Sequence, residues 1–249
     1  MKDLAAVILA AGQGTRMKSD LAKVLHPVQG NPMVSYVIRA VRQAGSRRII
    51  LVVGHQRERV MEALGGEQLE FAVQDEQLGT AHALMQTRAA LADYRGDLLV
   101  LAGDTPLLLG ETVSGLLSGH RAAGAAATVL TALLEDPGGY GRILRTPENT
   151  LDAIIEEKDA TSGQRAIREI NTGAYCFQSP LIFEVLDQIG RDNRQGEFYL
   201  TDAISILRAR GQIVAAVVAD DEREVLGVNS VEQLSQAEAL LTRRQESRN

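Results

Sequence analysis

The first half of the chain alternates short runs of apolar residues with segments whose apolar residues recur at helical spacing. The apolar runs predict buried strands at residues 7–9, 48–53, 69–74 and 97–102. The segments that alternate with them predict helices at residues 33–44, 57–64, 79–91 and 112–123. Strands and helices in this alternation predict an α/β fold built on a parallel, doubly wound sheet.

The pattern changes from Ala125 onward, where predicted strands follow one another more closely. These strands are predicted at residues 125–133, 142–144, 153–156, 170–177 and 213–218, with helices at 179–189 and 200–210. A last helix is predicted to begin at Ser230, because Ser230 and Gln233 have the spacing of a capping box. The second half therefore predicts a more antiparallel part of the same domain, and we find no repeat or long linker.

A glycine-rich stretch follows the first predicted strand, and residues 7–26 read VILAAGQGTRMKSDLAKVLH. Gly12 and Gly14 let backbone N–H groups approach an anion closely, because glycine has no Cβ. Arg16 and Lys23 can place positive charge beside that anion, so the stretch predicts a phosphate-binding site. The third glycine of the dinucleotide fingerprint and the Gly-Lys-Ser/Thr of a P-loop are both missing. On glycine spacing alone, an ordinary strand-to-helix turn therefore stays open.

Polar residues also follow two of the other predicted strands. Gln74 ends the strand at 69–74, and Asp104 comes two residues after the strand at 97–102. In doubly wound sheets, ligands bind beyond the carboxyl ends of the strands. We therefore expect the glycine loop, Gln74 and Asp104 to converge on one cleft.

Composition and charge narrow the classes of partner. The chain has 249 residues, 45% of them hydrophobic, and a net charge of −6, which argues against non-specific nucleic-acid binding. No apolar run approaches the length of a membrane span, and Asp3 interrupts the basic start, so we expect neither membrane insertion nor a signal peptide. The single Cys176 excludes an internal disulfide framework and favours a cytoplasmic location.

The glycine-rich stretch is more specific than its glycines, because it reads L-A-A-G-x-G-T-R-M followed by L-x-K-V-L-H-P. This pattern resembles the signature of the sugar-phosphate nucleotidyltransferases, and most closely the uridylyltransferase domains of bacterial N-acetylglucosamine-1-phosphate uridyltransferases. The resemblance runs from about Leu4 to the end of the chain. Further matching motifs are QDEQLGTAH (74–82), GDTP (103–106), GYGR (139–142), EEKDAT (156–161), EINTG (169–173), GEFYLTD (196–202) and GVN (227–229).

The resemblance implies a Rossmann-like, mostly parallel sheet with a smaller antiparallel sugar-binding lobe, the nucleotide-diphospho-sugar transferase fold. It implies attack by N-acetylglucosamine 1-phosphate on the α-phosphorus of UTP, which yields pyrophosphate and UDP-N-acetylglucosamine for cell-wall peptidoglycan. Because two anions must meet and the phosphate is already ionised, charge neutralisation and positioning matter more than a general base.

The resemblance also assigns roles to four charged or polar residues. Arg16 and Lys23 are the expected catalytic cations, and Asp104 and Asn229 are the expected ligands of a Mg²⁺ cofactor. Without the resemblance, Asp104 could cap the helix that follows it, and Asn229 could cap the last helix.

Substrate contacts follow from the matching positions. On the nucleotide side they are Leu9, Ala10, Ala11, Gly12, Gln74, Gly79 and Thr80, where the amide of Gln74 can match the edge of uracil. On the sugar side they are Tyr140, Gly141, Glu156, Asn171, Thr172, Tyr199 and Thr201. Glu156 could instead be a solvated strand residue. Tyr199 and Thr201 match less closely, because Phe198 stands where a second tyrosine is also common.

Other functions stay open. A relative could use another sugar 1-phosphate or dTTP. A catalytically silent regulatory subunit should have lost the cations or Asp104, which are present, and a Rossmann dehydrogenase would need an acidic residue where Gly54 follows Val53.

The resemblance predicts a nucleotidyltransferase domain over residues 1–228 and a C-terminal helix over residues 229–249. In the bifunctional relatives this helix leads to a trimerising β-helix with acetyltransferase activity. No hexapeptide repeats of that kind occur here, so we assign no acetyltransferase activity and leave the oligomeric state open.

Overall fold

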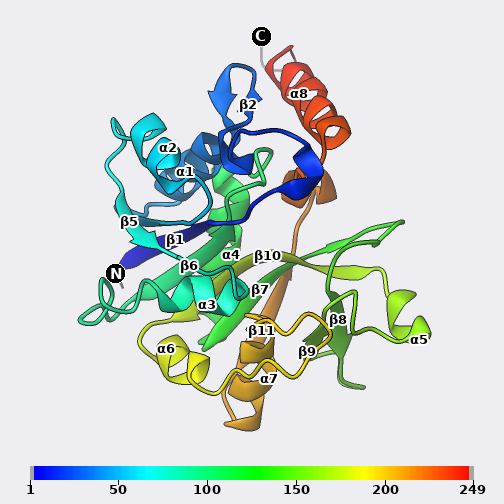
Figure 1. Ribbon diagram of the computed structural model, residues 1–249. Helices are drawn as coiled ribbons and strands as arrows, with labels where there is room; N and C mark the ends of the chain where they lie inside the picture. The colour runs from blue at the N-terminus through cyan, green and yellow to red at the C-terminus, as the bar shows by residue number, and fades with distance from the viewer. Residues whose placement is uncertain (1–2, 247–249) are drawn as a thin grey trace.

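The computed structural model describes residues 3–246, and within this range nine strands form one mixed sheet. The strand order is β11-β7-β10-β6-β1-β4-β5, and the β8–β9 hairpin joins the sheet through β10 (Figure 1). These strands are β1 (Leu4–Ala10), β4 (Arg48–Val53), β5 (Glu70–Val73), β6 (Asp97–Ala102), β7 (Ala127–Leu133), β8 (Arg142–Arg145), β9 (Leu151–Ile155), β10 (Glu169–Gln178) and β11 (Val214–Val218).

The two halves of the sheet differ in strand direction. β6, β1, β4 and β5 run parallel to one another, as does β11 to β7. β10 runs antiparallel to both β6 and β7, and β8 pairs antiparallel with β9. The predicted fold, a mostly parallel sheet with a smaller antiparallel lobe, is confirmed.

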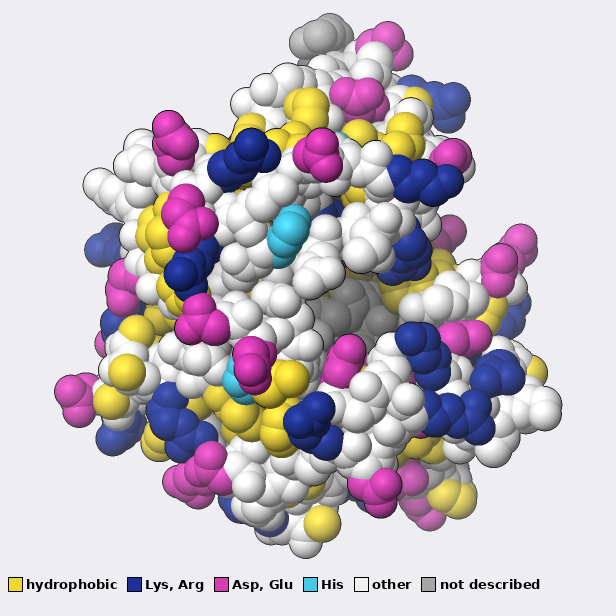
Figure 2. Space-filling view, viewed as in Figure 1, with side chains coloured by type: hydrophobic (Ala, Val, Ile, Leu, Met, Phe, Trp, Pro, Cys, Tyr) yellow, Lys and Arg dark blue, Asp and Glu magenta, His cyan; other side chains and the backbone are white. Residues whose placement is uncertain are grey.

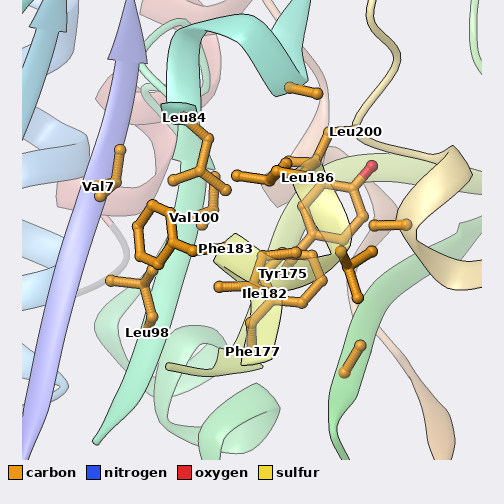
Figure 3. Close-up of a cluster of buried hydrophobic side chains, with 14 of the residues drawn as sticks. Val7, Leu84, Leu98, Val100, Tyr175, Phe177, Ile182, Phe183, Leu186 and Leu200 are labelled. Atoms are coloured by element: carbon orange, nitrogen blue, oxygen red, sulfur yellow. The ribbon is translucent and has the colours of Figure 1, made fainter. Parts of the chain in front are cut away.

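Helices cover both faces of the sheet, as a doubly wound fold requires. α1 (Met33–Gln43), α2 (Arg57–Ala63) and α4 (Gly110–Ala123) pack on one face, in a cluster that includes Ile8 and Leu51. α3 (Thr80–Met85), α6 (Leu181–Leu186) and α7 (Asp202–Ala209) pack on the other. Figure 3 shows this second cluster, which extends from Val7, Leu84 and Phe183 on one side to Tyr175 on the other.

Burial on both faces explains why the central strands read as unbroken apolar runs. In β1, Ala5 and Val7 pack into one cluster, whereas Ala6 and Ile8 pack into the other, because successive side chains point to opposite faces. All four are fully buried. The sequence signal for β1 is therefore continuous hydrophobicity rather than alternation.

Two helices are about half as long as predicted, whereas within residues 3–246 the others differ from their predicted bounds by at most two residues at either end. The helix expected over residues 79–91 spans only Thr80–Met85, and the chain then continues in turns. The buried Thr87 hydroxyl donates to the carbonyl of Leu84 at 2.7 Å, which is a local bond that competes with helix continuation. The helix expected over residues 179–189 spans Leu181–Leu186, because Gln188 and Ile189 bond three rather than four residues back.

The last helix, α8 (Val231–Glu246), lies beside the small hairpin of β2 (Pro27–Val28) and β3 (Asn31–Pro32) (Figure 1). Its buried Ala237 joins a cluster with Val28, Met33 and Leu107. The Ser230 hydroxyl accepts from the Gln233 N–H at 3.3 Å, as the capping box predicts, whereas the Gln233 side chain reaches back to the N–H of Asn229. The division into a nucleotidyltransferase domain over residues 1–228 and a C-terminal helix over residues 229–249 stays a prediction, and residues 1–2 and 247–249 of these segments lie outside the described residues. Among the helices described, none has the length and apolarity to cross a membrane.

Candidate active site

A cavity of about 390 Å³ opens at the carboxyl ends of β1 and β6. Figure 2 shows the hollow near the centre of this face, with basic and acidic side chains around its rim. Two-thirds of the residues predicted from the sequence line it: Leu9, Ala10, Ala11, Gly12, Lys23, Gln74, Gly79, Thr80, Asp104, Glu156, Asn171 and Thr201. The structure therefore brings together residues from most of the chain length.

The glycine loop is shaped by contacts on both sides of Arg16. Gly14 has φ +63°, and a Cβ there would lie 2.5 Å from the Cβ of Lys23, so the loop can pass Lys23 only with glycine at this position. The next turn, Thr15–Met17, is a short 3-10 helix in which Met17 is buried at 2% exposure. Met17 anchors the turn, and the neighbouring Arg16 is exposed.

Two cations meet a carboxylate and an amide beside this loop. The Lys23 ammonium donates to the Asp104 carboxylate and, at 2.7 Å, to Oδ1 of Asn229. Arg16 Nη2 donates to the same Asn229 oxygen at 2.9 Å. Asn229 is held there because the N–H of Val228 donates to the carbonyl of Asp104 at 2.8 Å. Segments more than 200 residues apart in the sequence thus form one charged cluster.

This cluster fits a Mg²⁺ ion. The carboxylate of Asp104 and the amide oxygen of Asn229 converge on one positive charge, the ammonium of Lys23. One carboxylate and one amide oxygen are a donor set that Mg²⁺ accepts when phosphates and waters complete its coordination. Among residues 3–246, no group of three or more His, Cys, Asp or Glu could hold a metal, and Asp104 and Asn229 stay predicted ligands.

The capping alternatives for Asp104 and Asn229 do not match the geometry. The residue before α4 is Leu109, so Asp104 does not cap that helix. The side-chain oxygen of Asn229 accepts from Arg16 and Lys23, while Ser230 supplies the cap of α8.

On the other side of the cavity, the Gln74 side chain is 3% exposed and turned inward. Its Nε2 lies 3.2 Å from the carbonyl of Gly79 and 3.1 Å from Nδ1 of His82. The following segment is tied to a distant loop, because the Thr80 hydroxyl accepts from the N–H of Leu200 at 3.0 Å. Gln74 and Gly79 are therefore held in fixed relation to each other.

Gly79 itself allows no side chain. Its φ is +111°, and a Cβ would lie 2.5 Å from the carbonyl oxygen of Phe198. We expect Gly79→Ala to lower the free energy of unfolding by about 1–3 kcal/mol, because it adds backbone strain and a clash. Urea unfolding measures this, with Gly66→Ala as control, since no atom lies within 4 Å of a Cβ at Gly66. Equal stability of the two variants would contradict the prediction.

The opposite wall carries Glu156 and Asn171. The Thr201 hydroxyl donates to Glu156 Oε1 at 3.1 Å, and Asn171 Nδ2 donates to the Tyr175 hydroxyl at 2.7 Å. The carbonyl of Gly141 accepts from the N–H of Asn171 at 2.9 Å, which fixes the turn before β8 against β10. This wall offers carboxylate, amide and hydroxyl groups to a ligand.

The other predicted sugar-side residues lie away from the cavity surface. The Tyr140 hydroxyl accepts from the N–H of Gly227 at 3.2 Å, next to the charged cluster. The Thr172 hydroxyl donates to the carbonyl of Leu130 and so links β10 to β7. The Tyr199 hydroxyl, in a side chain that is 6% exposed, accepts from Gln195 at 2.8 Å. These contacts support the walls rather than form them.

Several cavity residues were not predicted from the sequence, and they are Val24, Gln77, Ala83, Ala102, Gly173, Tyr175, Glu197 and Leu200. The sequence could have predicted that Tyr175 lines the cavity. Tyr175 stands four residues after Asn171 on one strand, and side chains at even spacing lie on the same face. Burial raises the pKa of its hydroxyl far above the usual range, so it stays protonated.

Comparison with known proteins places the chain among nucleotidyl transferases. Residues 6–175 match the MobA-like NTP transferase domain. The chain is 52% identical over 242 residues to the bifunctional protein GlmU of Syntrophotalea carbinolica, and the match covers 97% of this chain and 52% of that protein. The GlmU proteins of Bacillus mycoides and Geobacter metallireducens are 52% and 50% identical, over 98% and 95% of this chain. The chain spans about half the length of these relatives.

The fold is also similar to that of a solved enzyme. The crystal structure of UDP-glucose pyrophosphorylase complexed with UDP-glucose superposes with a TM-score of 0.76 at 18% identity, covering 98% of this chain and 100% of that one. This similarity bears on the fold alone.

Proposed function

The chain belongs to the family of MobA-like NTP transferase domains, and from this premise we propose that it transfers the uridylyl group of UTP to N-acetylglucosamine 1-phosphate. The observation that carries the proposal is the cluster in which Arg16 and Lys23 meet Asp104 and Asn229 at the edge of the cavity. Such a cluster suits a polyphosphate that arrives with a divalent cation. The similarity to the GlmU proteins supports the choice of sugar.

In the proposed reaction, a phosphate oxygen of the sugar 1-phosphate attacks the α-phosphorus of UTP. The bond from that phosphorus to the bridging oxygen breaks, and its electron pair leaves with pyrophosphate. Arg16 and Lys23 lower the repulsion between the two anions by placing positive charge beside the triphosphate. Asp104 and Asn229 would hold Mg²⁺, which supplies further positive charge there when bound.

The walls of the cavity would orient the two substrates. The inward amide of Gln74 and the backbone of Gly79 would contact the base, and Glu156 and Asn171 would contact the sugar. Because the attacking phosphate is ionised at neutral pH, no side chain has to remove a proton from it. Holding the two substrates in line is then the main contribution of the protein.

The test is pyrophosphate release from the purified chain with Mg²⁺, UTP and a panel of sugar 1-phosphates. Release specific to N-acetylglucosamine 1-phosphate supports the proposal. Release with another sugar, or with dTTP in place of UTP, would keep the chemistry and overturn the substrate. No release from folded protein with any pair would favour a silent subunit, although the four charged and polar residues of the cluster argue against it.

We expect the ionisation of Glu156 to make the free energy of unfolding depend on pH. Burial raises the pKa of its carboxyl, and the nearby carboxylates of Asp202, Asp159 and Glu197 raise it further, against a hydrogen bond from Thr201 that lowers it. The folded protein then binds this proton more tightly than the unfolded chain. Its contribution to the free energy of unfolding therefore falls as the pH rises from the usual glutamate pKa, about 4.3, through the raised value.

We expect Glu156→Gln, which is uncharged at every pH, to gain stability over the wild-type chain at pH 7.5 and to gain less at pH 4. Urea unfolding at the two pH values measures the difference. A stability difference that does not change with pH would contradict the raised pKa.

A further inference from the structure

The orientation of the Gln74 amide is settled by its surroundings. The carbonyl oxygen of Gly79 can only accept a hydrogen bond, and it lies 3.2 Å from the amide nitrogen of Gln74. Turning the amide over would place two carbonyl oxygens against each other. The nitrogen of the amide must therefore face Gly79, and the oxygen Oε1 is left free, since no group within residues 3–246 donates to it.

His82 holds the same nitrogen from a second direction. Its Nδ1 lies 3.1 Å from Gln74 Nε2, and because that nitrogen donates, Nδ1 must be the unprotonated acceptor of the ring. The ring is itself held, since it stacks on Phe198 with centroids 6.2 Å apart. Phe198 is fixed in turn, because its backbone bonds to Leu78 and Ala81. His82 is not among the residues that line the cavity, so it acts on a ligand through Gln74.

We propose that His82 is a positioning residue which, with the carbonyl of Gly79, fixes the Gln74 amide so that its oxygen selects a pyrimidine carrying a proton at N3. This inference rests on the proposed function, in which the base lies against Gln74. Uracil and thymine present an N3–H donor to that oxygen. Cytosine in the same pose presents a bare N3 acceptor, which would face another acceptor. Discrimination against cytosine thus follows from one fixed amide.

Two substitutions separate this role from a general contribution to the fold. His82→Leu removes the acceptor and leaves an apolar side chain beside Phe198. His82→Asn keeps an acceptor oxygen near the place of Nδ1. If the leucine variant does not fold, His82→Phe keeps a ring against Phe198 while still lacking the acceptor. Thermal unfolding confirms that each variant is folded before binding is measured.

The measurement is calorimetric binding of UTP and of CTP to the full chain with Mg²⁺ present. We expect the wild-type chain to prefer UTP. His82→Leu should lower the UTP preference about 3- to 10-fold, which is the net effect of one hydrogen bond, and His82→Asn should stay within about twofold of the wild-type chain. Equal loss of UTP and CTP binding in His82→Leu, or a wild-type chain with no preference, would overturn the inference.

Binding keeps this test separate from the proposed reaction. A changed UTP preference without turnover of any sugar 1-phosphate would support the role of His82 and count against the proposed function. Turnover of a sugar 1-phosphate, together with an unchanged UTP preference in His82→Leu, would support the proposed function and count against the role of His82.

Discussion

Asp104→Ala should reduce pyrophosphate release by a factor on the order of 1,000 while leaving the fold intact. Within residues 3–246 the Asp104 carboxylate bonds only to Lys23, and its side chain is 21% exposed, so its removal takes little from the core. The backbone carbonyl of Asp104, which accepts from Val228, is kept by alanine. The lost group is the one carboxylate of the candidate Mg²⁺ site. The effect should therefore fall on chemistry rather than stability.

Steady-state rates of pyrophosphate release test this, together with calorimetric titration of Mg²⁺ in the presence of UTP. Asp104→Asn, which keeps the shape and loses the charge, should retain more Mg²⁺ binding than Asp104→Ala. Asp93→Ala, at an exposed carboxylate outside the cavity, serves as the control. If folded Asp104→Ala turned over at the wild-type rate, the proposed role of Asp104 as a Mg²⁺ ligand would be wrong.

Strands were the most predictable elements, for a reason visible in β4 and β6. Both match the predicted bounds, residues 48–53 and 97–102. Each is an apolar run buried almost throughout, begins at a charged residue and stops before a small loop. Because both faces are buried, nearly every residue of such a strand is apolar. The strand can therefore be predicted without knowing which elements pack against it. The parallel order of the sheet followed from the alternation with helices.

Helix ends were less predictable, because they depend on single side chains and on contacts with other elements. The early end of α3 at Met85 depends on the Thr87 hydroxyl, which bonds to the Leu84 carbonyl three residues back. A pattern of apolar positions does not carry that information, since Leu91 continues the spacing and is buried, although the helix has ended.

The candidate site also contains residues that the sequence pattern predicts and residues that it does not. Gln74 and Asp104 were placed at one cleft by their position after strands, and both line the cavity. The contact between Arg16 and Asn229 joins residues 213 positions apart. No periodicity predicts such a contact, and only the resemblance of the whole sequence to a family indicated it. His82 went unassigned because its partner, the Gln74 amide, is defined by an orientation that appears only once the backbone of Gly79 is in place.

Arg16→Ala should lower kcat about 100- to 1,000-fold with a smaller change in the KM for UTP. Arg16 is exposed on the glycine loop, and its guanidinium donates to Asn229 at 2.9 Å. Met17, not Arg16, anchors the turn, so the loop should keep its path in the variant. A cation that acts on charge developing toward pyrophosphate stabilises the transition state more than bound UTP, and its loss then appears in kcat.

Arg16→Lys separates charge from geometry. A lysine keeps the positive charge but loses the planar fork of donors that matches phosphate oxygens, so we expect it to restore only part of the rate. Arg47→Ala, an exposed arginine at the far end of β4, controls for the loss of one surface charge. A KM for UTP that rises while kcat stays at the wild-type value would show that Arg16 only binds the substrate. In that case Lys23, which is 13% exposed and already bonded to both candidate Mg²⁺ ligands, would be left as the catalytic cation.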